Sequence, residues 1–92
     1  MKKVALILSG CGYMDGSEIH ETVACMYALE EVGLDYDCWA PETSFTVVDH
    51  CTKKPTEEKR SAIKEAARIA RSKIYSLPSA DPSLYDAALY PG

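Results

Sequence analysis

Residues Val4 to Val23 read VALILSGCGYMDGSEIHETV, and this stretch decides the fold. It opens with five apolar residues, which predict a strand buried on both faces. A loop follows with glycines at positions 10, 12 and 16, which permit backbone angles that other residues avoid. The stretch then enters a helix that carries Glu18 and Glu21 near its start. A buried strand, a glycine loop and an acidic helix start are typical of the place where an α/β protein builds its site.

Length and composition allow one globular domain with a modest core. The chain has 92 residues, of which 47% are hydrophobic, so wholesale disorder is not expected. The net charge of −4 argues against a nucleic-acid partner or an anionic membrane surface. No apolar run reaches the ~18 residues of a membrane span, and VALIL is too short for a signal peptide. The expected compartment is the cytoplasm, or an organelle after removal of a targeting segment.

Four cysteines lie thirteen or fourteen residues apart, at positions 11, 25, 38 and 51. They form no CxxC pair, so a structural zinc site is poorly supported and no metal or cofactor is predicted. In a reducing compartment we expect free thiols. A weaker alternative is a metal site made by Cys38, His50 and Cys51.

The rest of the chain alternates between strand-like and helix-like segments. A helix is expected over 17–32, capped by Ser17 or Asp15 and ended by Gly33, with its apolar face formed by Ile19, Val23, Met26 and Tyr27. Further elements are expected as strands at 34–40 and 45–48, a second helix from Thr56 to about Arg71, a short extended piece at 74–77 and a last strand at 85–90. This order predicts parallel strands with right-handed crossovers. Two helices are few for both faces of a parallel sheet, so the chain is organised like the first half of a domain.

Three interpretations of the opening stretch stand side by side. The glycines turn the chain and the acids stabilise the helix start, without any function. Alternatively the loop binds a nucleotide, but it is one residue out of register with G-x-G-x-x-G and has no Lys or Arg. In the third interpretation Glu18 and Glu21, which share a helix face, hold a carboxyl group against a cysteine thiolate.

Candidate nucleophiles within the chain are weak. Cys11 belongs to a tight turn and is expected to be structural. His50 and Cys51 are neighbours on an extended run, so their side chains point opposite ways and adjacency alone makes no dyad. His20 lies on a different side of the helix from the two glutamates.

At this point the residues carry a resemblance that covers essentially the whole chain. It rests on LILSGCGYMDGSEIHETV, on Ala40-Pro41, on Val48-Asp49-His50, on EAARIAR at 65–71 and on YDAALYPG at 85–92. These motifs resemble the enhancing-lycopene-biosynthesis (ElbB, also called ES-one) family of the DJ-one/PfpI, class I glutamine-amidotransferase-like superfamily. The resemblance implies a flavodoxin-like three-layer α/β sandwich with a mainly parallel sheet. Residues 1–92 would be the N-terminal half of one such domain.

The resemblance also implies roles for particular residues. In the superfamily a glutamate from the first helix hydrogen-bonds to a nucleophilic cysteine on a strand-to-helix elbow, and a Gly-Gly pair lends backbone N–H groups. Glu21 is the best match for that glutamate and Glu18 the second choice. Gly92 would be the first glycine of the pair, and Gly10 and Gly12 belong to the loop at the same edge. The elbow cysteine has no counterpart among residues 1–92.

What the resemblance implies about function is an isoprenoid-biosynthesis-associated protein, whose complete form is a homodimer with a glyoxalase- or lyase-like conversion of small dicarbonyls. This chain is expected to be inactive alone. The alternative is a non-enzymatic regulatory or interaction module that a partner chain completes.

Overall fold

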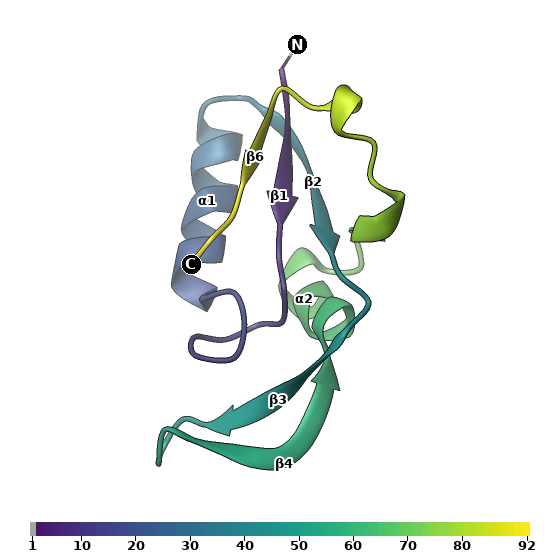
Figure 1. Cartoon of the computed structure of the whole chain (residues 1–92). Coiled ribbons are helices and arrows are strands. Elements are labelled where there is room, and N and C mark those ends of the chain that lie inside the picture. The colour runs from purple at the N-terminus through teal and green to yellow at the C-terminus, as the bar shows by residue number, and fades with distance from the viewer. Residues whose placement is uncertain (1) are drawn as a thin grey trace.

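The computed structural model describes residues 2–92, whose strands and helices form one parallel sheet, two helices and a separate hairpin (Figure 1). Two short 3₁₀ turns lie between the last two strands. The elements in chain order are β1 (Lys3–Ile7), α1 (Ile19–Glu31), β2 (Asp35–Ala40), β3 (Ser44–Asp49), β4 (Lys54–Ser61), α2 (Ala62–Ala70), β5 (Ile74–Ser76), η1 (Leu77–Ser79), η2 (Pro82–Leu84) and β6 (Ala87–Leu89).

The sheet has the strand order β5-β2-β1-β6, and every neighbouring pair is parallel. Leu6 of β1 lies opposite Cys38 of β2 on one side and Leu89 of β6 on the other. The apolar opening run therefore forms an inner strand, as expected, and Leu6 is completely buried. The predicted α/β class with a mainly parallel sheet is confirmed.

Both helices cover the same face of this sheet. Leu6, Leu8, Cys38, Ala40 and Ala66 form the buried core of that face, and partly buried side chains of α1 and α2 pack against it. This one-sided cover follows from the topology, because the chain moves in one direction from β1 to β2 to β5 and each crossover is right-handed.

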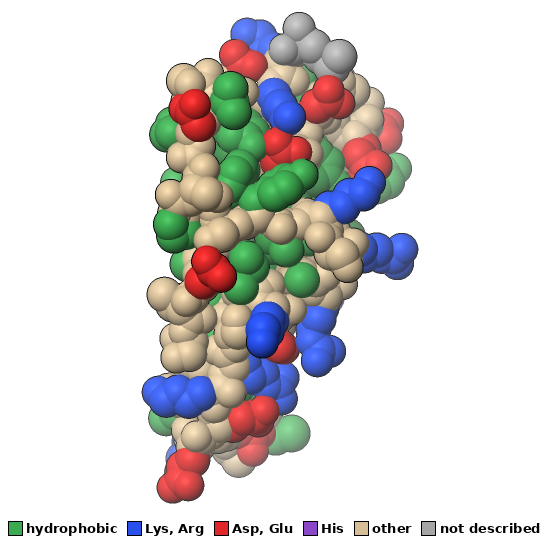
Figure 2. All heavy atoms as spheres, turned by 90° about the vertical axis from the view of Figure 1, so that its right-hand side faces the viewer, with side chains coloured by type: hydrophobic (Ala, Val, Ile, Leu, Met, Phe, Trp, Pro, Cys, Tyr) green, Lys and Arg blue, Asp and Glu red, His purple; other side chains and the backbone are tan. Residues whose placement is uncertain are grey.

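The opposite face of the sheet carries the segment with the two 3₁₀ turns. Trp39 Nε1 donates to the hydroxyl of Tyr85 at 2.8 Å, and that hydroxyl donates to Asp37 Oδ2 at 2.7 Å. Lys3 Nζ lies 3.0 Å from the same carboxylate oxygen, so the segment is tied to β1 and β2 by a continuous polar network. Figure 2 shows this side, with hydrophobic side chains gathered over the sheet and charged ones around them and along the hairpin.

The prediction of a second helix from Thr56 was wrong in its first part. Residues 54–61 are strand β4, which pairs antiparallel with β3, and the helix begins only at Ala62. Ser61, not Thr56, is its N-cap and accepts from the N–H of Lys64 at 3.3 Å. Glu57 and Glu58 consequently lie on an exposed ribbon that extends away from the sheet (Figure 1). The backbone groups of β3 form their hydrogen bonds with the segment that follows it in the sequence, which is why residues 54–61 are a strand.

The apolar face expected for the first helix was also only partly right. Ile19, Val23 and Tyr27 are 43%, 49% and 69% exposed, whereas Thr22 and Leu29 point into the core. Thr22 is tolerated there because its hydroxyl donates to the Glu18 carbonyl at 2.7 Å, which leaves its methyl group to pack. The helix ends as predicted, with Gly33 at a φ of 74°.

No helix within residues 2–92 is long and apolar enough to cross a membrane.

Candidate functional site

The loop after β1 closes on itself through backbone hydrogen bonds. The N–H of Ser17 donates to the Ser9 carbonyl at 2.7 Å, and the N–H of Gly12 donates to the Ser17 carbonyl at 2.8 Å. The Ser17 hydroxyl also accepts from the N–H of Ser9 at 3.0 Å. A Cβ atom on Gly16 would lie 2.7 Å from the Ser9 carbonyl oxygen, so only glycine fits there. The loop is therefore a rigid support that aims the start of α1 at the carboxyl edge of the sheet.

Glu21 meets Gly92 at this edge. β1 and β6 run parallel, so the loop after β1 and the residues after β6 emerge on the same side. The N–H of Gly92 donates to Glu21 Oε1 at 3.1 Å. A Cβ atom on residue 92 would lie 2.6 Å from that oxygen, so a larger residue there would displace the Glu21 carboxylate from its present position. Two positions selected from the sequence, 71 residues apart, are in direct contact.

Glu18 has a different role from Glu21. It is the N-cap of α1, and its Oε1 accepts from the N–H of Glu21 at 2.8 Å. Its own N–H donates to the Gly92 carbonyl at 2.5 Å, and its second carboxylate oxygen lies 3.3 Å from His20 Nδ1. Because capping occupies Glu18, Glu21 is the carboxylate that remains available for a ligand or a neighbouring side chain.

The N–H groups of Gly10 and Gly12 are used within the protein. Gly10 donates to the Ala62 carbonyl at 3.0 Å, which joins the loop to the first residue of α2, and Gly12 donates to Ser17. These glycines shape the loop, and their N–H groups already have partners in this structure. Any part of the two glycines in a site stays a prediction.

Cys11 lies in this loop but is not activated. Burial raises the pKa of its thiol, the charge of Glu65 raises it further, and Arg68 opposes them. A thiol shifted in this direction stays protonated at neutral pH, which is the wrong state for a nucleophile. The expectation that Cys11 is structural agrees with this environment.

The hairpin contacts the glycine loop, a contact that no pattern in the sequence predicted. Asp15 accepts from the N–H of Val48 at 2.9 Å, and His50 Nε2 donates to the Tyr13 carbonyl at 2.6 Å. A polar pocket of about 230 Å³ lies between the two segments, with Cys11 and His50 among its lining residues. Both contacts join residues more than thirty positions apart, so no local pattern could have indicated them.

The remaining candidates lie apart from Glu21. His50 is a hydrogen-bond donor in its loop, and Cys51 is exposed at the hairpin tip. Cys38 is buried in the sheet, so the alternative metal site with His50 and Cys51 does not assemble. Within residues 2–92 no group of three or more His, Cys, Asp or Glu side chains is placed to hold a metal ion. All four cysteines are free thiols.

Comparisons with known proteins show what this chain is similar to. The human glutamine amidotransferase-like class 1 domain-containing protein 3, mitochondrial, is 44% identical over 92 residues, which cover 98% of this chain and 34% of the human protein. The rat ES1 protein homolog, mitochondrial, is also 44% identical, with 35% of its length covered. A crystal structure of an isoprenoid biosynthesis protein with an amidotransferase-like domain from Ehrlichia chaffeensis superimposes with a TM-score of 0.95 at 39% identity, over 100% of this chain and 44% of that one.

The chain is similar to ES1 proteins and to an isoprenoid biosynthesis protein with an amidotransferase-like domain. The resemblance drawn from the motifs is thereby confirmed. The chain spans about a third of the length of the curated relatives that it matches. No family model matches the sequence.

The site in this ES1-like chain consists of a rigid loop, a capped helix start and one available carboxylate against a glycine peptide. A carboxylate held by a backbone N–H can bond a second donor with its other oxygen. Glu21 could thus accept from a protonated group, or exchange a proton with one, at the carboxyl edge of the sheet. The roles assigned to Glu21, Glu18 and the three glycines by resemblance stay predictions.

Proposed function

We propose that this chain supplies the carboxylate part of a cysteine-dependent site in an ES1/ElbB-like protein. The observation that carries the proposal is the contact between Glu21 Oε1 and the Gly92 N–H, which fixes a carboxylate beside the chain that follows β6. Glu21 would face the thiol of a cysteine from outside residues 1–92. Within them, burial keeps the Cys11 thiol protonated, Cys25 and Cys38 belong to the core and Cys51 lies at the hairpin tip. The chain alone is then inactive.

The reaction class that fits is the conversion of a small dicarbonyl into a hydroxy acid. In that conversion the aldehyde carbon is oxidised, the neighbouring carbonyl carbon is reduced, and one water is consumed. The electrons balance within the substrate, so the chemistry needs a thiolate to add to the aldehyde and a group that moves a proton between the two carbons. Glu21 would move that proton, and no external electron acceptor is required. An association with isoprenoid biosynthesis is proposed from the name of the Ehrlichia chaffeensis relative.

The test compares thiol titration in the native protein and in its variants. The intact mass and the reading frame first establish whether the native polypeptide contains a cysteine besides those at 11, 25, 38 and 51. Glu21→Gln should then shift the titration of that thiol and slow consumption of methylglyoxal. Glu57→Gln, an exposed change on the hairpin, should do neither. A native polypeptide with no further cysteine, or a titration unaltered in Glu21→Gln, would refute the catalytic role.

A second candidate function is an interaction module, and strand β6 favours it. β6 is an edge strand, and its three residues Ala87, Ala88 and Leu89 are all exposed. An exposed apolar edge accepts another strand. A partner chain that completes the sheet would occupy this edge, whereas the catalytic proposal predicts a homodimer of the complete form. Light scattering of the natively purified protein distinguishes these arrangements by mass. The compartment stays proposed as the cytoplasm, and the mammalian relatives are named mitochondrial.

A further inference from the structure

A pocket lies between the two helices, away from the Glu21 site. It has a volume of about 420 Å³, which is within the range of about 300–1,000 Å³ for small-molecule sites. Its lining includes Met26 of α1 and Ile69 of α2, together with the residues that follow α2. Glu21 belongs to the first turn of α1, whereas the segment that follows α2 lies where β5 begins, so the two regions occupy opposite edges of the parallel sheet.

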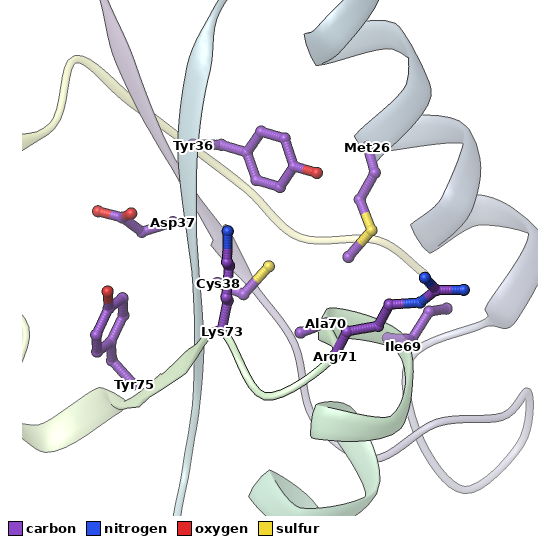
Figure 3. Close-up of a pocket in the computed structure, with 9 residues that line it drawn as sticks. All are labelled: Met26, Tyr36, Asp37, Cys38, Ile69, Ala70, Arg71, Lys73 and Tyr75. Carbon is purple, nitrogen blue, oxygen red and sulfur yellow. The ribbon is translucent and has the colours of Figure 1, made fainter.

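One wall of the pocket is apolar, although polar atoms make up at least half of the lining. Met26, Ile69 and Ala70 form its helical walls, and Tyr36 and Cys38 point into it from β2 (Figure 3). The Cys38 thiol stays protonated, because burial and the neighbouring Asp37 raise its pKa to about 11. The pocket thus offers an apolar wall beside a protonated thiol.

Two cationic side chains, Arg71 and Lys73, also line the pocket, and Figure 3 shows their charged ends on different sides of it. Among residues 2–92 neither forms an ion pair, whereas Lys3, Arg60 and Arg68 do. The charges of Arg71 and Lys73 are therefore available to a ligand.

The nearby carboxylates do not cancel these positive charges. Asp37 also lines the pocket, but its carboxylate points to the opposite face of the sheet (Figure 3), where Lys3 and Tyr85 bind it. Glu30 belongs to α1 and interacts with Tyr36, whose pKa is raised by burial and by this carboxylate. A negative group would accordingly bind beside Arg71, and a hydrocarbon chain would lie along the apolar wall.

The backbone at Arg71 and at the residue that follows it has an unusual conformation. Arg71 and Ser72 are consecutive non-glycine residues in the left-handed region, with φ of 58° and 73°. Glycine is the residue that ordinarily ends a helix in this conformation. An arginine there costs free energy that glycine would avoid, and such strain is a reason to look for a function of the side chain.

We propose that this pocket binds an amphipathic anion, a short hydrocarbon chain with a carboxylate or phosphate head group. The chain lies against the apolar wall that includes Met26 and Ile69, and the head group binds Arg71. This site is independent of the Glu21 site and of the function proposed for it.

The experiment observes the methionine methyl groups by NMR in protein labelled with ¹³C-methyl methionine. Octanoate is the probe, with octanol as the uncharged match and acetate as the anion without a chain. Octanoate should shift the Met26 methyl resonance in a saturable way and leave that of Met14, which is exposed in the glycine loop, unchanged. Octanol should bind about tenfold more weakly, as expected when a hydrogen bond to a charged group is lost, and acetate should cause no shift. Octyl phosphate then shows which head group is preferred.

Arg71→Gly is the decisive variant because it separates binding from folding. Glycine fits the left-handed conformation, so the variant should melt at the same temperature as the wild type or higher. It should nevertheless bind octanoate about tenfold more weakly, and Arg71→Asn, which also tolerates this conformation, should behave alike. Lys64→Gln removes an exposed charge from α2 outside the pocket and should leave binding unchanged.

Three results would overturn the proposal. Octanol could bind as tightly as octanoate, Arg71→Gly could bind octanoate like the wild type, or Met26 and Met14 could shift together without saturation.

Discussion

Ala66 provides the sharpest test of how α2 packs on the sheet. Its side chain is completely buried among Leu6, Leu8, Cys38 and Ala40. Ala66→Leu adds three carbon atoms at this point. If space were available, burial at about 0.8 kcal/mol per methylene would stabilise the fold by roughly 2 kcal/mol. Because no part of Ala66 is accessible, we expect overpacking to dominate and to destabilise the fold by roughly 1–3 kcal/mol.

Urea denaturation followed by circular dichroism measures this change directly. The midpoint should fall without a change in slope, and the melting temperature should fall by roughly 4–8 °C per kcal/mol for a domain of this size. Ala24→Leu makes the same substitution at an exposed position on α1 and should be nearly neutral. An Ala66→Leu protein as stable as the wild type, or more stable, would show that the helix does not pack on the sheet as described.

Three further results are expected. Burial and the hydrogen bond to a carboxylate raise the pKa of Tyr85 to about 12, so stability should fall as the pH rises from about 10 to 12; Tyr85→Phe should remove that dependence in pH-jump unfolding. Cys51 is exposed and Cys38 is 4% exposed, so iodoacetamide should alkylate Cys51 first in a peptide-mapping time course. Gly16→Ala should destabilise the fold by more than about 1 kcal/mol in urea, because its Cβ would lie 2.7 Å from the Ser9 carbonyl; an unchanged midpoint would show that the loop can relax.

The sheet could be predicted because its signals are local. Five successive apolar residues specify an inner parallel strand, and Gly33 ends a helix through its own backbone freedom. The order of strands and helices then leaves few topologies, since crossovers in parallel sheets are right-handed. These features depend on residues that are close together in the sequence.

The hairpin could not be predicted in the same way. Thr56, Glu57 and Glu58 satisfy the local preferences of a helix start, yet residues 54–61 pair with β3. The free energy that decides between these outcomes comes from pairing with another segment and from the contacts of Asp15 and His50 with it. Local propensity is weak beside such tertiary contacts. The exposed positions of Ile19 and Val23 have a similar cause. Thr22 is buried in their place because its hydroxyl has a hydrogen-bond partner, and a hydropathy pattern carries no information on that bond.

The distinction between the two glutamates shows how one hydrogen bond can set a site. Spacing alone places Glu18 and Glu21 on the same helix face, and it does not say which of them is available. The Ser17 hydroxyl would be the ordinary cap, but the N–H of Ser9 already donates to it. Glu18 therefore caps the helix, and Glu21 is the carboxylate that meets Gly92. The chemistry at this edge thus depends on the closure of the glycine loop, and replacing Ser17 should change the environment of Glu21 although the two side chains do not interact.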